Sequence, residues 1–303
     1  MNIKGANHMD INIELYKIFE QVASSGSFSE AAKVLFVSQS AVSQAIKTLE
    51  SKLGTPLFIR TTKKITLTPA GETLLEHVQP AIRLIKQGEH RLTQENSLEN
   101  GSLHIGASDT ICRYFLLSYL QDFHKKHPNV SIKITNQTSP RCVELLETGQ
   151  VDCIVVNTPN SHLRPEFISK IVGNFQDVFI AGKGFEHLKD REISLKEIGQ
   201  YPIMTLDRKS TTSEFLHHLF MERHLELSPE LEAGSNDLLL DLARIDLGIA
   251  FVPDYCVPKK TQNLFKIKIA ERLPKRQLVA AYSSLLPPSP VVREFLEGLS
   301  TDA

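Results

Sequence analysis

The chain has 303 residues, of which 41% are hydrophobic and 23% are charged, and its formal net charge at pH 7 is −1. This length allows two or three domains with hydrophobic cores, and the balanced charge excludes a protein that coats nucleic acid indiscriminately. The sequence contains neither a run of about 18 apolar residues nor an apolar signal-peptide core, so it predicts no membrane span and no export, and a cytoplasmic location is expected.

The chain opens with a polar segment and a first amphipathic helix. Residues 1–8 show no periodicity, so they are set aside as extra N-terminal residues, and the first domain is taken as residues 9–67. Ser24, Ser25 and Gly26 mark the end of the helix. Its apolar stripe is formed by Leu15, Ile18, Phe19 and Val22.

Two further short helices are predicted almost end to end. Ser27 and Glu30 have the spacing of a capping box, and the apolar face behind them consists of Phe28, Ala31, Ala32 and Leu35. Ser38 is the expected N-cap of the next helix, which ends at Gly54 and carries an apolar stripe of Ala41, Val42, Ala45, Ile46, Leu49 and Leu53. This spacing indicates a helix-turn-helix.

The outer face of the second of these helices carries small hydroxyl and amide side chains in its first half. The candidate DNA contacts on this face are Gln39, Ser40, Ser43, Gln44 and Lys47. A recognition helix enters the major groove with its N-terminal residues at the base edges, where amides suit adenine and small hydroxyls contact phosphate or allow close approach. An ordinary solvated pair of helices has the same periodicity, so the pattern alone leaves both interpretations open.

Two short β-prone runs follow, Leu57 to Arg60 and Ile65 to Leu67, and they predict a wing. Arg60 at its base and Lys63 and Lys64 at its tip are candidate contacts to phosphates or to the adjacent minor groove. A solvated turn is the alternative. Between residues 31 and 71 the chain has six basic residues and a single acidic one, a local net charge of +5, which favours DNA binding.

This region also carries a family resemblance. The run AA-x-x-L-x-x-SQSAVSQ-x-I-x-x-LE-x-x-LG-x-x-LF-x-R, from Ala31 to Arg60, closely resembles the N-terminal signature of the LysR-type transcriptional regulators. The resemblance implies a winged helix-turn-helix, a long dimerising linker helix and a C-terminal effector domain, in a tetramer built from two dimers. The implied partners are double-stranded DNA and a small-molecule effector, and RNA polymerase is a further candidate.

Thr68 and Pro69 predict the start of a long linker helix over residues 68–95, followed by a hinge at 96–102. Pro80 and Gly88 interrupt its apolar seam, so packing on the chain's own body is the alternative to pairing with a second copy. The seam has nearly the a/d spacing of a coiled coil, which favours a homodimer, and consists of Leu74, Val78, Ala81, Ile85 and Leu92.

From residue 103 the sequence alternates β-rich runs with amphipathic helices. Strands are predicted in two series, at 103–107, 130–135 and 151–156, and at 177–181, 202–205 and 248–252. Each series is of the β-α-β type, which predicts a two-lobed α/β domain with parallel sheets. Lobe I is taken as residues 103–172 and 276–303, and lobe II as 173–275. This arrangement resembles LysR-type effector domains and periplasmic solute-binding proteins.

Polar residues follow several of these strands, where open parallel sheets bind ligands at helix N-termini. Capping is the alternative role for each of them. The expected effector is a small carboxylate or similar anion, and Asp109 favours one that also carries an amino group. The resemblance places Ser108, Ser139 and Thr205 at matching positions of the family's effector pocket. The candidate effector contacts are Ser108, Thr110, Ser139, Asn157 and Thr205.

The cysteines and histidines indicate neither a disulfide framework nor a metal site. The cysteines at 112, 142, 153 and 256 are scattered, which predicts reduced thiols, and a redox pair of Cys142 and Cys153 is the alternative. His217, Met221 and His224 share one helical face but lack an acidic or cysteine partner. No metal and no cofactor is therefore expected.

Catalytic signatures are also missing from the sequence. It contains no GxSxG elbow, no Walker loop and no HExxH pair. The sequence therefore favours a ligand-responsive DNA-binding regulator that recognises a roughly palindromic operator, and not an enzyme. The alternatives are an enzyme or a solute-binding module with an accessory N-terminal helical domain.

Overall fold

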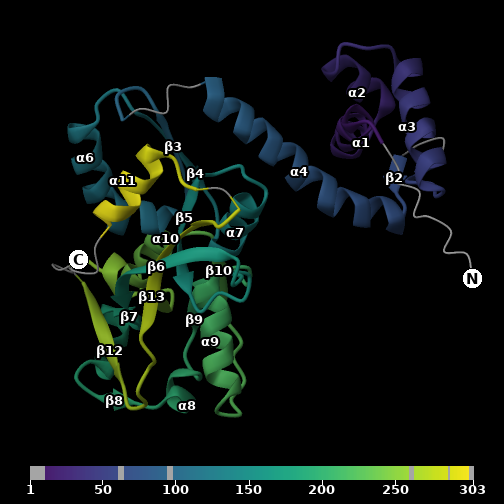
Figure 1. Ribbon diagram of the computed structural model, residues 1–303. Coiled ribbons are helices and arrows are strands. Elements are labelled where there is room, and N and C mark those ends of the chain that lie inside the picture. Colours follow the sequence, from purple (N-terminus) through teal and green to yellow (C-terminus); the bar gives the residue numbers. More distant parts are fainter. Residues whose placement is uncertain (1–10, 61–64, 94–97, 259–262, 286, 300–303) are drawn as a thin grey trace, which may run out of the picture. The chain divides into compact units, whose positions relative to one another are not determined.

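The computed structural model describes residues 11–60, 65–93, 98–258, 263–285 and 287–299. The chain divides into two compact units, Met1–His90 and Arg91–Ala303 (Figure 1). Within the described ranges, no helix is long and apolar enough to cross a membrane.

The first unit begins with three helices, α1 (Ile13–Ser25), α2 (Phe28–Val34) and α3 (Gln39–Leu53). Each starts at a side-chain N-cap, because Asn12, Ser27 and Ser38 each accept a hydrogen bond from a backbone N–H of the first turn. Their apolar stripes meet in one core, which includes Phe19, Val22, Phe28, Val42, Ile46 and Leu49. The predicted helix-turn-helix is therefore confirmed.

The wing is an antiparallel pair of strands, β1 (Phe58–Arg60) and β2 (Ile65–Leu67). Glu50 of α3 fixes its start, since Oε1 of this side chain accepts hydrogen bonds from the backbone N–H of Leu57 at 2.8 Å and of Phe58 at 3.3 Å. The one acidic residue between positions 31 and 71 therefore joins the wing to α3.

Helix α4 (Pro69–Thr93) contains Pro80 in its interior and contributes to the core of the first unit. Val78 and Ile82 are 8% and 3% exposed and pack with α1, α2 and α3, whereas Ala81 and Ile85 are exposed. The predicted seam is therefore divided, because one part packs on the chain's own body and the other part lies on the surface.

Gly71 lies where α4 passes close to the wing, and this contact gives a prediction. A Cβ atom at Gly71 would lie 2.2 Å from the carbonyl oxygen of Leu57, so alanine requires the backbone to move. Gly71→Ala is expected to destabilise the first unit by about 1–3 kcal/mol. The measurement is amide hydrogen exchange of peptides from α3 and β1 in the full chain, which should become faster.

Gly88→Ala is the matched control, because a Cβ atom there meets no atom within 4 Å. Alanine is a better helix former than glycine by about 1 kcal/mol, so this variant should slow exchange in α4. Unchanged or slower exchange in the Gly71→Ala chain would contradict the close contact.

The second unit contains two α/β lobes, and lobe I is the sheet with strand order β4-β3-β5-β13-β6 and its helices. One face is covered by α6 (Leu117–Lys126) and α11 (Pro290–Gly298), and the other by α7 (Ser139–Glu147) (Figure 1). A short helix, α5 (Asp109–Ile111), and a π-helical turn, η1 (Cys112–Leu116), lead into α6. The strands are β3 (Ser102–Ala107), β4 (Ser131–Asn136), β5 (Cys153–Thr158), β6 (Phe167–Phe175) and β13 (Arg276–Ser283).

Lobe II is the sheet with strand order β10-β9-β11-β7-β12-β8 and its helices. One face packs on α8 (Leu195–Ile198) and α9 (Thr211–Met221), and the other on α10 (Asn236–Arg244). Short 3-10 helices, η2 (Lys183–Leu188) and η3 (Asp254–Cys256), follow β7 and β11. The strands are β7 (Asp177–Gly182), β8 (Glu192–Ile193), β9 (Ile203–Leu206), β10 (Leu231–Ala233), β11 (Ile249–Pro253) and β12 (Leu264–Ile269).

The chain crosses between the lobes twice. Strand β6 ends at Phe175 and β7 begins at Asp177, and the return brings β13 into lobe I at Arg276. The predicted two-lobed α/β architecture is confirmed. The predicted parallel pairing is confirmed for β3, β4 and β5 and for β9 and β11, but it is wrong for β7. Strand β13 is antiparallel to β5 and β6, and β7 is antiparallel to β11 and β12. The crossings introduce these antiparallel strands, and a β-α-β pattern does not report them.

Candidate functional site

The outer face of α3 is the first candidate site. Its buried face consists of Val42, Ile46 and Leu49, so the opposite side of the helix is free of the core. Four of the five predicted contacts, Gln39, Ser40, Gln44 and Lys47, are exposed, and Ser43 is half-buried. Ser40 Oγ lies 2.9 Å from Ser38 Oγ, so the N-cap and one predicted contact share a hydrogen bond.

None of the three predicted wing contacts has a described side chain. Arg60 is the last residue of β1, and its side chain is not described. Lys63 and Lys64 lie outside the described residues. A role of these three side chains at DNA therefore stays a prediction.

A polar cavity of about 260 Å³ lies between lobe I and lobe II. Four predicted effector contacts, Ser108, Thr110, Ser139 and Asn157, line it from lobe I. They are brought together because strands β4, β3 and β5 are adjacent and parallel, so their carboxyl ends meet at one edge of the sheet. Ser139 Oγ accepts a hydrogen bond from the backbone N–H of Asn157 at 3.2 Å, which ties two of these residues to each other.

The fifth predicted contact, Thr205, does not line the cavity. It is fully buried in β9, and Leu206 and Asp207 reach the cavity instead. The expected strand ended at Thr205, whereas β9 continues through Leu206, so the strand end lies one residue later than predicted.

The lobe II wall of the cavity was missed by the sequence analysis. It contains the N-terminal residues of α9, Ser210 to Thr212, and those of α10, Ser235 and Asn236. The apolar patterns in the sequence predict these two helices near Phe215 to Arg223 and Leu238 to Ile245, so both predicted starts are too late. Ser210 and Ser235 are N-cap residues, and recognising them as such would have extended both helices to the cavity.

The helices that begin at the cavity differ in whether a side chain accepts a hydrogen bond from the backbone N–H groups of their first turn. Ser210 Oγ caps α9 by accepting a hydrogen bond from Ser213 N–H at 3.1 Å. Among the described contacts, α7 and α10 have no side-chain cap, although Thr138 and Ser235 occupy the N-cap positions. The first-turn N–H groups and positive ends of these two helices are therefore suited to an anion in the cavity.

Three side-chain contacts, here called the interlobe bonds, join α5 and η1 of lobe I to the start of α10. Asn236 Nδ2 donates to Thr110 Oγ1 at 2.9 Å, and Tyr114 Oη donates to Asp237 Oδ1 at 2.5 Å. Arg113 Nη1 lies 3.4 Å from Asp237 Oδ2. Burial and the hydrogen bond to Asp237 raise the pKa of Tyr114 to about 12, so its hydroxyl remains a donor at neutral pH. Two cavity residues, Thr110 and Asn236, thus belong directly to the contact between the lobes.

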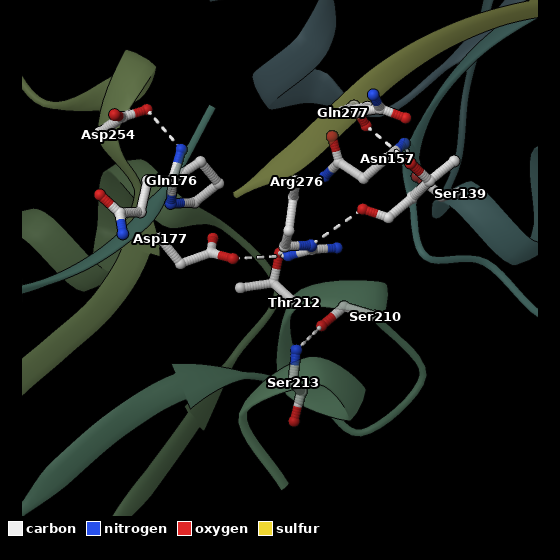
Figure 2. Close-up of polar contacts among 12 residues, drawn as sticks. Ser139, Asn157, Gln176, Asp177, Ser210, Thr212, Ser213, Asp254, Arg276 and Gln277 are labelled. Carbon is white, nitrogen blue, oxygen red and sulfur yellow. Dashed lines mark hydrogen bonds and ion pairs between the residues drawn. The ribbon is translucent and has the colours of Figure 1, made fainter. Parts of the chain in front are cut away.

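A buried ion pair lies where the chain crosses between the lobes (Figure 2). Arg276 Nη1 donates to Asp177 Oδ2 at 2.7 Å, and both side chains are fully buried. The same guanidinium donates to Thr212 Oγ1 at 3.2 Å and, through Nε, to the carbonyl oxygen of Thr158 at 3.1 Å. Burial raises the pKa of the Asp177 carboxyl, and the guanidinium opposes this shift. Arg276 therefore connects β5 of lobe I with β7 and α9 of lobe II.

Removing one partner of this pair is expected to be strongly destabilising. Asp177→Asn leaves the Arg276 guanidinium buried without its countercharge, which typically costs about 3–5 kcal/mol. The measurement is the urea midpoint of the second unit, followed through hydrogen exchange of peptides from β7 and β13. Glu197→Gln, which breaks the more exposed pair with Arg191, is the control and should change stability by less than about 1 kcal/mol. A similar effect of both changes would contradict a structural role for the buried pair.

The cysteines do not form the redox pair considered from the sequence. Cys142 of α7 packs in the cluster on one face of the lobe I sheet, and Cys153 of β5 packs in the cluster on the other face. The sheet therefore separates their thiols. Burial raises the pKa of Cys112 to about 11 and of Cys142 to about 12, and it also raises the pKa of Cys153 and of Cys256.

These shifts predict unreactive thiols. At pH 7.5 a thiol with a pKa of about 11 is ionised in roughly one molecule in several thousand, and the thiolate is the reactive form. Iodoacetamide should therefore leave the native chain unmodified over the time in which it alkylates glutathione completely, as read by intact mass. A mass shift in the native chain, or a Cys142–Cys153 cross-linked peptide after oxidation, would contradict this prediction.

The helical face with His217 gives no metal site in the described part of the chain. Within that part, no group of three or more His, Cys, Asp or Glu residues is placed to hold a metal ion. His217 and Met221 line an open surface hollow together with Arg208 and Glu214, and burial lowers the pKa of His217.

A helix-turn-helix with an exposed polar helix, followed in the chain by a two-lobed domain with a polar cavity, defines a class of protein that binds DNA and a small ligand. Residues 13–72 match the family model for the bacterial regulatory helix-turn-helix protein, lysR family, and residues 96–302 match the model for the LysR substrate binding domain. The chain therefore belongs to the LysR family of transcriptional regulators, and this family is not one of enzymes.

The chain is similar to other transcriptional regulators over most of its length. The chain is 28% identical to the transcriptional activator IlvY of Salmonella typhimurium over 262 residues, which cover 84% of this chain and 87% of that protein. It is 27% identical to a probable RuBisCO transcriptional regulator of Thalassiosira pseudonana over 261 residues, which cover 84% of this chain and 85% of the relative.

Solved structures show the same fold along nearly the whole chain. A full-length OxyR variant from Pseudomonas aeruginosa matches with a TM-score of 0.68 at 18% identity, over 96% of this chain and 95% of that one. Full-length CbnR complexed with its target DNA matches with a TM-score of 0.65 at 20% identity, over 95% and 99% of the two chains. The regulatory domain of Synechocystis CcmR, in complex with 2-PG, matches over 66% of this chain and 96% of that one, with a TM-score of 0.61 at 18% identity.

Proposed function

We propose that this LysR-type regulator binds a specific, roughly palindromic operator as a symmetric assembly and that a small anionic effector in the cavity between the lobes modulates this binding. The observation that carries the proposal is the outer face of α3. Gln39, Ser40 and Gln44 are exposed there, in the first half of a helix that begins at a side-chain cap. These are the side chains and the helix position with which helix-turn-helix proteins contact base edges.

Phosphate contacts supply affinity in addition to this base readout. Lys47 is exposed one turn beyond the polar residues, and Arg60, Lys63 and Lys64 of the wing are proposed to contact phosphates or the adjacent minor groove. CbnR, which was solved with its target DNA, supports this use of the fold. We therefore propose a cytoplasmic DNA-binding protein whose affinity for DNA falls as the salt concentration rises.

A second copy of the chain completes the operator-binding unit. Ala81 and Ile85 of α4 lie on the surface, at positions of the predicted coiled-coil seam that the core of the first unit does not use. Two symmetric copies would place two recognition helices at half-sites separated by about one helical turn or a multiple of it. We propose a dimer through this seam, assembled further into a tetramer, with RNA polymerase as a partner at the promoter.

The effector is proposed to act by shifting the balance between arrangements of the lobes. The cavity is lined from both lobes, and Thr110 and Asn236 belong at once to its wall and to the interlobe bonds. The uncapped starts of α7 and α10 favour an anion such as a carboxylate. A ligand that binds one lobe arrangement better than another changes their populations, and the regulator's DNA affinity with them.

The DNA-binding half of the proposal is tested by a gel shift with the region upstream of the chain's own gene. Combined replacement Gln39→Ala, Ser43→Ala and Lys47→Ala is expected to weaken specific retardation at least about 30-fold, because each good base contact is worth about 1–3 kcal/mol. For Lys47→Ala alone, the slope of log affinity against log salt concentration should become less steep by about 1, because one phosphate contact is lost.

Lys125→Ala is the control, because this exposed lysine lies on α6 in the second unit. Its retardation should equal that of the unchanged chain. Unchanged affinity and selectivity in the folded triple variant would overturn the assignment of α3 as the recognition helix.

A further inference from the structure

The charged side chains that are described on the cavity wall are both acidic. Asp109, which follows β3 in lobe I, and Asp207, which follows β9 in lobe II, both line it. Among the described residues that line the cavity, none is a lysine, an arginine or a histidine. Arg276 lies nearby but is fully buried, and its guanidinium is bound to Asp177. A purely anionic ligand would therefore meet two carboxylates and no cationic side chain on the cavity wall.

The starts of two helices, in contrast, favour a negatively charged group on the ligand. The first turns of α7 and α10 present backbone N–H groups without a side-chain acceptor in the described structure, and both begin among the residues that line the cavity. Such N–H groups, at the positive end of a helix, are the natural partners of a carboxylate. The cavity thus provides donors for a negative group and carboxylates for a positive one.

The side chain of Asn236 provides independent evidence for a ligand, because it has an acceptor atom without a donor in the described structure. This side chain is 3% exposed and lines the cavity, and its Nδ2 is already used in the hydrogen bond to Thr110. Its Oδ1 is buried and accepts no hydrogen bond from any described residue. An unsatisfied buried acceptor costs free energy, which a donor on a ligand would recover.

We propose that the effector is a small acid that also carries an ammonium group, as an amino acid does. Its carboxylate is held at the starts of α7 and α10, and its ammonium group is held by Asp109, Asp207 and the Oδ1 of Asn236. An ammonium group has three N–H donors and no acceptor, so it matches three acceptors on the cavity wall. This assignment rests on the proposed function, since it concerns the same cavity.

The test is isothermal titration of the full chain with matched pairs of ligands. Each pair consists of an L-amino acid and the same acid without its amino group, for example L-alanine with propionate and L-aspartate with succinate. At least one amino acid is expected to bind roughly tenfold or more tightly than its partner, because a charge-assisted contact of this kind is worth at least about 1.4 kcal/mol.

Asp109→Asn and Asp207→Asn should each reduce this preference several-fold, and the double variant should abolish it. Asp122→Asn is the matched control, because this carboxylate is exposed on α6 and does not line the cavity. It should leave the preference unchanged. A structural role of Asp109 or Asp207 would instead weaken both members of each pair equally.

The proposal is overturned if the deaminated acids bind as well as the amino acids, if the asparagine variants strengthen the preference, or if no amino acid in the panel binds. A gel shift with the same preparations separates this failure from failure of the regulator proposal. Specific DNA retardation without any ligand preference would remove only the ammonium assignment, whereas loss of specific retardation would remove the proposed function itself.

Discussion

The buried ion pair of Arg276 and Asp177 is the interaction on which the arrangement of the two lobes depends. These residues are the first of β13 and the first of β7, so the pair ties together the two points at which the chain enters a new sheet. Through Thr158 and Thr212 the same guanidinium also reaches the end of β5 and the start of α9. Buried charges persist only where partners replace their hydration, so the spacing of the lobes at the crossings is tightly specified.

The position of the cavity follows from the sheet topology. Parallel strands end at one edge, and the helices that follow them must begin there, so polar caps and backbone N–H groups gather between the lobes. In the first unit, too, a polar side chain determines how neighbouring elements are placed. Glu50 is the only acidic residue between positions 31 and 71, and its carboxylate holds the start of the wing against α3 instead of facing solvent.

The sequence predicted most accurately those features whose signals are local. The stripes and caps of α2 and α3 lie within a few residues of each other, and the strands β3, β5, β7 and β11 appear as short apolar runs, so all of these could be located. Strand β13 depends on pairing across more than a hundred residues and carries no local sign of its direction. The sequence did not reveal the lobe II wall of the cavity, because the predicted starts of α9 and α10 are four and two residues late. Nothing near Arg276 in the sequence indicates its partner, Asp177.

The interlobe bonds hold the two lobes against each other through Thr110, Tyr114 and Arg113 on one side and Asn236 and Asp237 on the other. A ligand that changes the arrangement of the lobes must strengthen or weaken these contacts, each of which contributes on the order of 1 kcal/mol. Since 1.4 kcal/mol corresponds to a tenfold change in an equilibrium constant, loss of one such contact would change the proposed balance between lobe arrangements by about fivefold. Under the proposed function, substitutions of Arg113, Tyr114 or Asp237, none of which lines the cavity, would therefore change the response threshold without changing the residues that contact the effector.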